Sequence, residues 1–431
     1  MVLKKISYVP IASDIIHSGH LNIIKHAKKY GDVIIGLLSD EAISQYRDFP
    51  ILNYSERYNL VSKISGINKI IKQNDWDYKL TLKKIKPDYF VHGDDWKKGN
   101  LSHVRKFVIN EMKSWGGKII EVPFTRNISK KLIKDKIDLN LSISSRVSLL
   151  KRMLILRKKL IGIEAHNGLS AHIIENIKLN EKNKTKVFDL LWSSSLTDST
   201  IRAMPDNQSV DYSIRINGLN EITNISSKPI IFDADNGGKI EHLPYLVKSL
   251  EKSGVSAIVL EDKIGLKINS LFADQSKSKQ DTIKKFSKKI KVACDSRISK
   301  DFMIFARIES LILGTGMQDA ILRSKNYVKS GADGIFIHSK KKDSKEILDF
   351  LKKFREFSKD TTVMVVPSTY SFTREEKLFL GGANIVVYAN QLLRSAHKAM
   401  EETASQILKN GRAYEADKNI SSIKKIIKLI R

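Results

Sequence analysis

The feature that most limits the fold of this 431-residue chain is a repeated alternation of short apolar runs with helix-length segments. Beyond about residue 160, eight such runs follow one another, and each has the composition of a buried strand. They are LIGIEAH, KPIIFDAD, SAIVLED, KVACDS, FMIFARIES, DGIFIHS, TTVMVVPS and ANIVVYAN. Eight strands separated mostly by helices predict a (β/α)8 barrel of the TIM type, with roughly 290 residues.

The first part of the chain shows the same α/β alternation on a smaller scale. Strand-like runs at 32–38, 88–93 and 118–124 are separated by helical stretches, which predicts a Rossmann-like domain with a parallel sheet. From 127 to 157 the pattern becomes polar and charged, and then apolar at helical spacing. We therefore predict a domain at 1–135, a linker at 136–144 and a barrel at 145–431.

Composition limits the compartment and the partners. The chain has 42% hydrophobic residues, enough for a core in each domain, and a formal net charge of +28. Its one cysteine, Cys294, excludes an intramolecular disulfide, and neither a signal peptide nor a bilayer-spanning run is evident, so a cytoplasmic protein without a membrane partner is expected. The lysines are spread along the chain without interleaved aromatics, which favours small anionic substrates over nucleic acid.

Charged residues stand at the ends of the predicted barrel strands. The active sites of such barrels lie at the carboxyl ends of the strands, so Asp233, Asp235, Glu261, Arg307 and His338 are expected to converge. Neighbouring carboxylates suit Mg2+, which prefers oxygen ligands. From spacing alone, these carboxylates are equally consistent with acidic groups that are solvated or paired with Lys and Arg.

Several longer motifs raise the specificity of this interpretation. EDKIGLKINSL (261–271) resembles the gating loop of the phosphoenolpyruvate mutase family, within the isocitrate lyase superfamily. EAHNGLSA, FARIES, GADGIFIHSKK, VPSTY and YANQLLRSAHKAM resemble that family in the same order, over 145–431. Lyases of the superfamily carry a catalytic cysteine in this loop, whereas Cys294 lies elsewhere, at the end of the KVACDS run, and is interpreted as a core residue.

The resemblance implies a role for each matching residue. Asp233 would bind Mg2+ directly, and Asp235 and Glu261 would reach it directly or through water. The other catalytic residues that it implies are Asp206, Lys267, Asn269, Arg307 and His338. The substrate-binding residues that it implies are Trp192, Ser194, Ser195, Leu196, Ser270 and Leu271.

The implied reaction interconverts phosphoenolpyruvate and 3-phosphonopyruvate, with formation of a C–P bond. Asp206 would act as a transient nucleophile or as a positioning group, and the sequence leaves both roles open. Ser195 replaces a common glycine, and 236–242 (NGGKIEH) departs from the family's usual loop after the metal aspartates. A phosphonopyruvate hydrolase, which shares the barrel and the metal site, is the nearest alternative.

A second set of motifs occupies the first domain. HSGH (17–20) follows a strand-like run and opens a helix, where backbone N–H groups and two imidazoles can contact phosphate. With GLLSDEAI, YSERYNLV and HGDDWKKG, it resembles the glycerol-3-phosphate cytidylyltransferase branch of the HxGH nucleotidyltransferases, over about 5–135. The nucleotide-binding residues that the resemblance implies are Asp14, His17, His20, Arg57, Asp94 and Ser129.

His17 and His20 would stabilise the transition state as a phosphonate oxygen attacks the α-phosphorus of CTP. Two usual motifs of the family are changed in this chain. IASD (11–14) stands in place of Gly-Thr-Phe-Asp, and FTRNISKK (124–131) stands in place of Arg-Thr-Glu-Gly-Ile-Ser-Thr-Thr. A degenerate nucleotide-binding or oligomerisation module is therefore the alternative. The fusion resembles bifunctional enzymes of phosphonate biosynthesis of the fosfomycin type, and family resemblance implies a homodimer or homotetramer.

Overall fold

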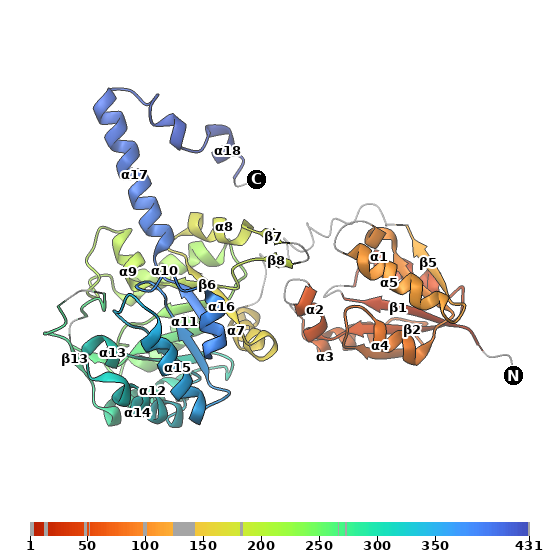
Figure 1. Cartoon of the computed structure of the whole chain (residues 1–431), viewed down its shortest axis with the longest axis horizontal. Helices are drawn as coiled ribbons and strands as arrows, with labels where there is room; N and C mark the ends of the chain where they lie inside the picture. The colour runs from red at the N-terminus through yellow and green to blue at the C-terminus, as the bar shows by residue number, and fades with distance from the viewer. Residues whose placement is uncertain are drawn as a thin grey trace. The chain divides into compact units, whose positions relative to one another are not determined.

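The computed structural model describes residues 4–12, 16–46, 50, 52–97, 101–123, 143–181, 184–265, 267–271 and 274–429. The chain divides into two compact units, whose main segments are Met1–Leu141 and Phe188–Arg431 (Figure 1). Most of the predicted linker falls within 124–142, outside the described residues. No helix in the described ranges is both long and apolar enough to cross a membrane.

The first unit is built on a five-stranded parallel sheet in the order β3-β2-β1-β4-β5. Its strands are β1 (Ile6–Ile11), β2 (Asp32–Leu38), β3 (Lys69–Gln73), β4 (Tyr89–Gly93) and β5 (Lys118–Val122). The strand order reverses between β1 and β4. In open sheets of this kind, ligands bind outside the carboxyl ends of the strands at such a reversal.

Both faces of this sheet are covered. Neighbouring residues of a strand point to opposite faces, so Tyr8 packs in one core with Phe90 and Trp96, and Val9 packs in the other with Val91. The covering helices are α1 (Ser18–Ala27), α2 (Asp40–Tyr46), α3 (Tyr54–Ser62), α4 (Lys79–Ile85), the short 3-10 helix η1 (Asp94–Lys97) and α5 (Ser102–Lys113). The predicted Rossmann-like class is confirmed.

The second unit is a closed barrel of eight parallel strands, in the order β10-β11-β14-β15-β16-β17-β6-β9. They are β6 (Leu160–Glu164), β9 (Leu190–Ser193), β10 (Ile230–Asp233), β11 (Ala257–Glu261), β14 (Met303–Ile308), β15 (Gly334–Ile337), β16 (Thr362–Val365) and β17 (Ile385–Tyr388). The predicted TIM-type barrel is therefore confirmed.

Helices and short strands precede, connect or follow the barrel strands. The helices are α7 (Ile143–Arg157), α8 (Gly168–Asn176), α9 (Ser195–Thr200), α10 (Tyr212–Thr223), α11 (Leu243–Lys252), α12 (Ile283–Ser296), α13 (Ser310–Leu313), α14 (Gly316–Lys329), α15 (Lys345–Phe357), α16 (Glu375–Gly381) and α17 (Gln391–Asn410). Two short hairpins pair β7 (Leu179–Glu181) with β8 (Lys184–Lys186), and β12 (Lys263–Ile264) with β13 (Lys279–Gln280).

One of the eight predicted strands was wrong. KVACDS is the last part of α12, whose Phe286, Ile290 and Ala293 are buried at helical spacing. Cys294 therefore lies in a helix, and its Sγ contacts the Gly331 carbonyl oxygen at 3.1 Å. The missing strand is β9, whose four buried residues were interpreted only as part of a binding motif.

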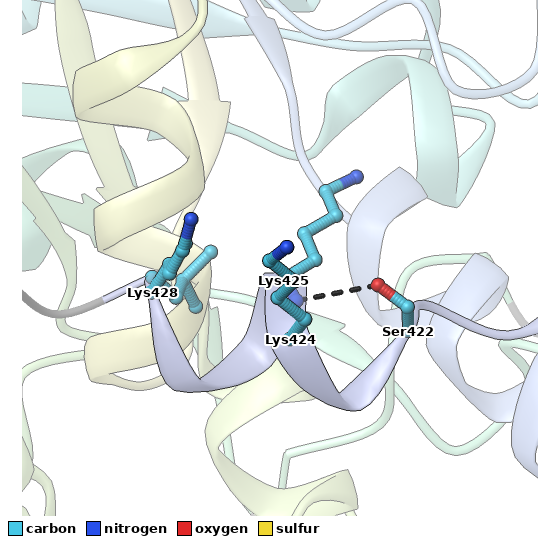
Figure 2. A pocket seen from close by; sticks show the side chains of 5 residues that line it. Ser422, Lys424, Lys425 and Lys428 are labelled. Atoms are coloured by element: carbon cyan, nitrogen blue, oxygen red, sulfur yellow. Dashed lines mark hydrogen bonds between the residues drawn. The ribbon is translucent and has the colours of Figure 1, made fainter.

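The chain ends on exposed helices. α17 extends away from the barrel wall (Figure 1) and buries only Leu393. It is followed by the 3-10 turn η3 (Asp417–Asn419) and by α18 (Ile423–Ile427). Figure 2 shows Ser422 capping α18 by accepting a hydrogen bond from the backbone N–H of Lys425, with lysine side chains extending from the helix.

Candidate active site

The predicted metal carboxylates lie at the carboxyl ends of two adjacent strands. Asp233 is the last residue of β10, and Glu261 is the last residue of β11. Asp235 follows β10 with φ at +49°, a left-handed conformation that Asp adopts more readily than most residues. Its backbone N–H donates to Asp233 Oδ1 over 3.2 Å, and its carbonyl accepts from the Glu261 N–H over 2.7 Å. All three side chains are buried.

Two buried cations lie against these carboxylates. Lys267 Nζ is paired with Asp235 Oδ1, and it also donates to the hydroxyl of Ser195. Arg307 Nη1 lies 3.6 Å from Asp233 Oδ2, and its Nη2 lies 3.6 Å from Glu261 Oε2. The structure therefore brings the three carboxylates together with the cations that offset their charge.

Burial and neighbouring charge shift the pKa values of these groups in different directions. Burial alone would lower the pKa of Lys267, but Asp235 and Asp233 raise it overall, so the side chain stays cationic. Burial would raise the pKa of Asp233, but Lys267 and Arg307 lower it, so this carboxylate is ionised. At Glu261 burial dominates over Arg307 and raises the pKa to about 7.

Asp206 is held by two residues that follow β12. Lys267 Nζ donates to Asp206 Oδ1 over 2.9 Å, and Asn269 Nδ2 donates to Asp206 Oδ2 over 2.7 Å. Each carboxylate oxygen thus has its own donor. The three residues predicted to be catalytic on this side of the site are in direct contact, although 61 residues separate Asp206 from Lys267 in sequence.

On the other side, Arg307 and His338 share a buried carboxylate that the sequence interpretation missed. Glu309 Oε1 accepts from Arg307 Nε over 2.6 Å and from His338 Nε2 over 2.8 Å. Burial would raise the pKa of Glu309, but Arg307 and His338 hold it well below its ordinary value. Burial lowers the pKa of His338, so the ring is neutral. Its proton is on Nε2, and Nδ1 is left as an acceptor.

Four of the predicted substrate-binding residues lie around the start of α9. Trp192 Nε1 is buried with no acceptor among the described residues, and the indole packs edge-on against Phe336. Ser194 and Leu196 flank Ser195 at the start of the helix, and the Ser195 hydroxyl donates to Asp233 Oδ2 over 3.2 Å. Ser270 and Leu271, which were also predicted to bind the substrate, lie in the segment that follows β12.

Ser270 Oγ is within hydrogen-bond distance of Lys263, Arg307 and Glu309. The Leu271 side chain is exposed, and its backbone N–H donates to Asn269 Oδ1 over 2.9 Å. The predicted contact of either residue with a substrate stays a prediction. Both hold the chain that follows β12 in place.

A second residue that the sequence interpretation missed, a cation, lies next to Asp235. Arg215 of α10 is buried, donates through Nε to Asp198 Oδ2 over 2.8 Å, and places Nη1 3.5 Å from Asp235 Oδ2. Neither Nη atom makes a hydrogen bond within the described ranges. Its guanidinium lies over the Phe232 ring, 4.2 Å from the centroid. No sequence motif marks Arg215, because its contact with Asp235 depends on which strand α10 packs against.

The donor set can be tested against Mg2+ directly. The described residues hold no group of three or more His, Cys, Asp or Glu side chains arranged around one ion, because Lys267 and Arg307 lie against the carboxylates. However, Mg2+ usually takes one or two protein carboxylates and keeps several waters. Asp233 is ionised, and Glu261 Oε2 is buried without a hydrogen-bond donor in the described chain. These residues fit a magnesium ion that one or two carboxylates bind directly and the remaining carboxylates reach through water, rather than an ion bound directly by all three.

The histidines of the first unit begin α1. His17 is the N-cap residue, and its Nδ1 accepts from the Gly19 backbone N–H over 3.1 Å. The His17 backbone N–H in turn donates to His20 Nδ1 over 3.4 Å, and the two ring centroids are 4.0 Å apart. Because both Nδ1 atoms accept hydrogen bonds, each neutral ring carries its proton on Nε2.

The other nucleotide-binding predictions have different outcomes. Asp94 opens η1 directly after β4, at the same strand-order reversal as His17 and His20. Arg57 is buried in α3 and donates to the Leu38 carbonyl over 2.8 Å and to Asp40 over 2.6 Å, so this structure directs it to the protein. Asp14 and Ser129 lie outside the described residues.

Comparison with known proteins assigns both units. Residues 150–408, more than half of the chain, match the family described as Phosphoenolpyruvate phosphomutase. The chain belongs to this phosphomutase family. Residues 13–147 match the cytidylyltransferase-like family, so the phosphomutase-family barrel follows an N-terminal cytidylyltransferase-like domain.

Two curated relatives carry different activities on the same barrel. The phosphoenolpyruvate phosphomutase of Tetrahymena pyriformis is 31% identical over 289 residues, which cover 67% of this chain and 92% of that protein. The phosphonopyruvate hydrolase of Variovorax sp. (strain Pal2) is 34% identical over 270 residues, covering 62% of this chain and 89% of the relative. The family is therefore established, but the sequence identities to these relatives do not distinguish a phosphomutase from a phosphonopyruvate hydrolase.

Solved structures agree on the barrel. A phosphoenolpyruvate phosphomutase from Streptomyces platensis subsp. rosaceus aligns with a TM-score of 0.60 and 29% identity, covering 66% of this chain and 94% of that one. A phosphonopyruvate hydrolase complex with oxalate and Mg2+ aligns with a TM-score of 0.58 and 32% identity, with the same coverage. That structure shows a metal ion bound in a related barrel.

Proposed function

We propose that the barrel interconverts phosphoenolpyruvate and 3-phosphonopyruvate, the C–P bond-forming first step of phosphonate biosynthesis. The observation that carries the proposal is the pair of contacts from Lys267 and Asn269 to Asp206. They join two residues of the EDKIGLKINSL segment to the aspartate predicted to act as a nucleophile or a positioning group. A lyase of the superfamily would need a cysteine in this segment, whereas Cys294, the one cysteine of the chain, lies in α12.

In the proposed reaction the P–O bond of phosphoenolpyruvate breaks, and the phosphorus bonds to C3 of the resulting pyruvate enolate, so no atom is gained or lost. Arg307 is a fixed cation that stabilises the transferring phosphoryl charge. Lys267 offsets the negative charges of Asp206 and Asp235. The indole N–H of Trp192, which has no acceptor in the described part of the chain, supplies a donor for the substrate carboxylate.

His338 donates its Nε2 proton to Glu309 and so positions this carboxylate, which in turn accepts from Arg307. Asp206 serves either as a transient nucleophile or as a positioning group. A magnesium ion held by Asp233, with Asp235 and Glu261 binding directly or through water, would supply charge stabilisation for the enolate and phosphoryl oxygens.

A phosphonopyruvate hydrolase is the second candidate, favoured by the 34% identity to the Variovorax enzyme. Phosphorus NMR separates the two activities. Because C–P formation is uphill, the assay starts from phosphonopyruvate, with Mg2+ present. We expect a phosphoenolpyruvate signal. Formation of only inorganic phosphate and pyruvate would replace the mutase proposal with the hydrolase.

For the first unit we propose transfer of CMP from CTP to a small phosphonate, with release of pyrophosphate. The support is the cytidylyltransferase-like match together with His17, His20 and Asp94 at the strand-order reversal. The Nε2–H groups inferred for the two histidines are suitable donors to phosphate oxygens. A degenerate module that only binds nucleotide or holds an oligomer together is the alternative, and an assay for pyrophosphate tests between them.

A further inference from the structure

The Ser270 hydroxyl has no hydrogen-bonding capacity left for a substrate. A hydroxyl has one donor and two acceptor positions. Ser270 Oγ donates to Glu309 Oε2 over 2.7 Å and accepts from Lys263 Nζ and from Arg307 Nη2, each over 2.9 Å. All four side chains are buried. Ser270 is therefore the centre of a saturated polar cluster.

The partners of Ser270 are fixed to the barrel independently of the segment Lys267–Leu271. Lys263 belongs to β12, which pairs with β13, and its Nζ lies 3.5 Å from Glu309 Oε2. Glu309 follows β14, and its backbone N–H donates to Asp262 Oδ1 over 3.0 Å. The same Lys263 Nζ also donates to the Ile268 carbonyl over 2.7 Å, so it holds the segment at two points.

The cluster also reaches the reacting end of the site. Arg307, which donates to Ser270, lies 3.6 Å from both Asp233 and Glu261. Within the same segment, Lys267 and Asn269 contact Asp206. Release of Ser270 would therefore free the segment that carries both Asp206 contacts and would admit water to the same space.

We propose that Lys263, Glu309 and Ser270 form a latch that holds Lys267–Leu271 closed over the site, and that the latch decides whether carbon or water captures the phosphoryl group. The second part rests on the mutase function proposed above. Capture by water cleaves the C–P bond of phosphonopyruvate, forms a P–O bond to water and gives phosphate, while the enolate takes up a proton and leaves as pyruvate. Exclusion of water by the closed segment favours return to carbon.

The test compares Ser270→Ala, Lys263→Met and Ser270→Thr with the full-length wild-type chain. Ser278→Ala is the matched control, because Ser278 lies in the same connection and donates to Gln275 Oε1 without contacting the latch. Amide hydrogen exchange of the peptide containing Lys267–Leu271 reports on closure without substrate. Phosphorus NMR on phosphonopyruvate reports the ratio of phosphate to phosphoenolpyruvate.

We expect Ser270→Ala and Lys263→Met to accelerate exchange by about tenfold or more, as loss of hydrogen bonds to charged groups predicts, and to raise the phosphate ratio. Ser270→Thr, which keeps the hydroxyl, should show an exchange rate and a phosphate ratio close to those of the wild type. Ser278→Ala should change neither the exchange rate nor the phosphate ratio. Unchanged exchange in Ser270→Ala, with only a higher KM, would show that Ser270 contacts substrate and would overturn the latch.

Faster exchange with an unchanged product ratio would overturn the proposed control of capture by water. If the wild-type enzyme yields only phosphate, the mutase proposal itself has failed, and the exchange measurement still decides whether the latch exists. Melting temperatures of the variants identify any loss of the fold, and Ser270→Ala, which removes a single oxygen atom, carries the test if Lys263→Met does not fold.

Discussion

At the scale of single residues, Asp233 is the carboxylate of the barrel site on which several neighbouring charged groups act. Its carboxylate accepts from Ser195 and lies close to Arg307, and its pKa is lowered against the effect of burial by Lys267 and Arg307. An ionised carboxylate in this position is the natural first ligand for a divalent cation. Its loss should therefore affect metal binding and turnover together.

We expect Asp233→Ala to reduce kcat/KM for phosphonopyruvate by roughly a thousandfold or more, because metal stabilisation of the transition state is worth several kcal/mol. Calorimetric titration with Mn2+ should show a parallel loss of binding. Asp295→Ala, at an exposed position of α12, is the control and should keep both properties. Near-normal turnover in Asp233→Ala would remove this residue from the metal site.

Glu121 gives a prediction for the first unit. A hydrogen bond from Arg105 is the main cause that lowers its pKa from 4.5 to about 2, and Trp96 and Lys97 contribute. A carboxylate with a lowered folded-state pKa stabilises the fold above the unfolded value and loses this contribution as pH falls through the folded value. The contribution of Glu121 should be complete above about pH 4.5 and gone near pH 2.

Accordingly, Glu121→Gln should be less stable than wild type near neutral pH, by a modest amount because the ion pair is partly open to solvent. The difference should shrink as pH falls through that window. Tryptophan fluorescence during urea unfolding is a suitable measurement, because three of the four tryptophans lie in the first unit. Glu111→Gln, on the same helix as Arg105, is the control. A gap between Glu121→Gln and wild type that stays constant with pH would contradict the prediction.

The residues that the sequence revealed are those that belong to compact motifs. Asp233 and Asp235 stand two apart, and Lys267 and Asn269 lie within one loop, so their grouping is local and readable. Glu309 was in principle detectable, since it stands two positions after Arg307 at the end of a strand. Arg215 was not, because its contact with Asp235 depends on how a helix packs beneath a strand.

At the scale of elements, the one wrong strand has a clear physical cause. The run KVACDS is short, with apolar residues at its centre, but it continues an amphipathic helix whose buried face begins at Phe286. Short apolar runs are ambiguous between strand and helix unless the flanking period is considered. β9 was missed because it is short. It has only four residues, and the polar start of α9 follows directly.

α17 leads to a prediction about assembly. This helix buries only Leu393, while Met400, Ile407 and Leu408 are exposed. α8 also exposes Leu169 and Ile173, one turn apart. Exposed apolar surface of this kind is a usual sign of association, in agreement with the homo-oligomer implied by family resemblance.

We expect light scattering after size exclusion to give at least twice the chain mass of 48.9 kDa. Leu408→Glu combined with Met400→Glu should lower that mass or make the assembly concentration-dependent, because it places charges on the apolar face. Lys398→Glu, at an exposed and already charged position of the same helix, is the matched control. A monomeric wild-type chain would contradict the expectation.

At the scale of the whole molecule, one chain carries two sets of polar groups that include donors suited to anionic ligands. The barrel site combines Arg307, Lys267 and Arg215 with its carboxylates, while the first unit places two histidines at a helix start. A net charge of +28 favours the approach of small anions to both. The two sets belong to separate units with their own cores, so damage to one should leave the other intact.

The last prediction separates a catalytic role of the histidines from a capping role. His17 caps α1, and Asn is also a good N-cap residue, so His17→Asn should keep the helix while removing the imidazole. We expect His17→Asn, His17→Ala and His20→Ala to abolish pyrophosphate release from CTP while sparing the conversion of phosphonopyruvate. His26→Ala, on the same helix, is the control.

The acceptor panel contains 2-hydroxyethylphosphonate, 2-aminoethylphosphonate and glycerol 3-phosphate. If His17→Asn retains transfer, the ring serves only as a cap. If the wild-type chain releases no pyrophosphate with any acceptor, and CTP does not raise its melting temperature as a ligand of the folded state must, the first unit is a degenerate module. Loss of the barrel activity in the histidine variants would instead show that the two units depend on each other.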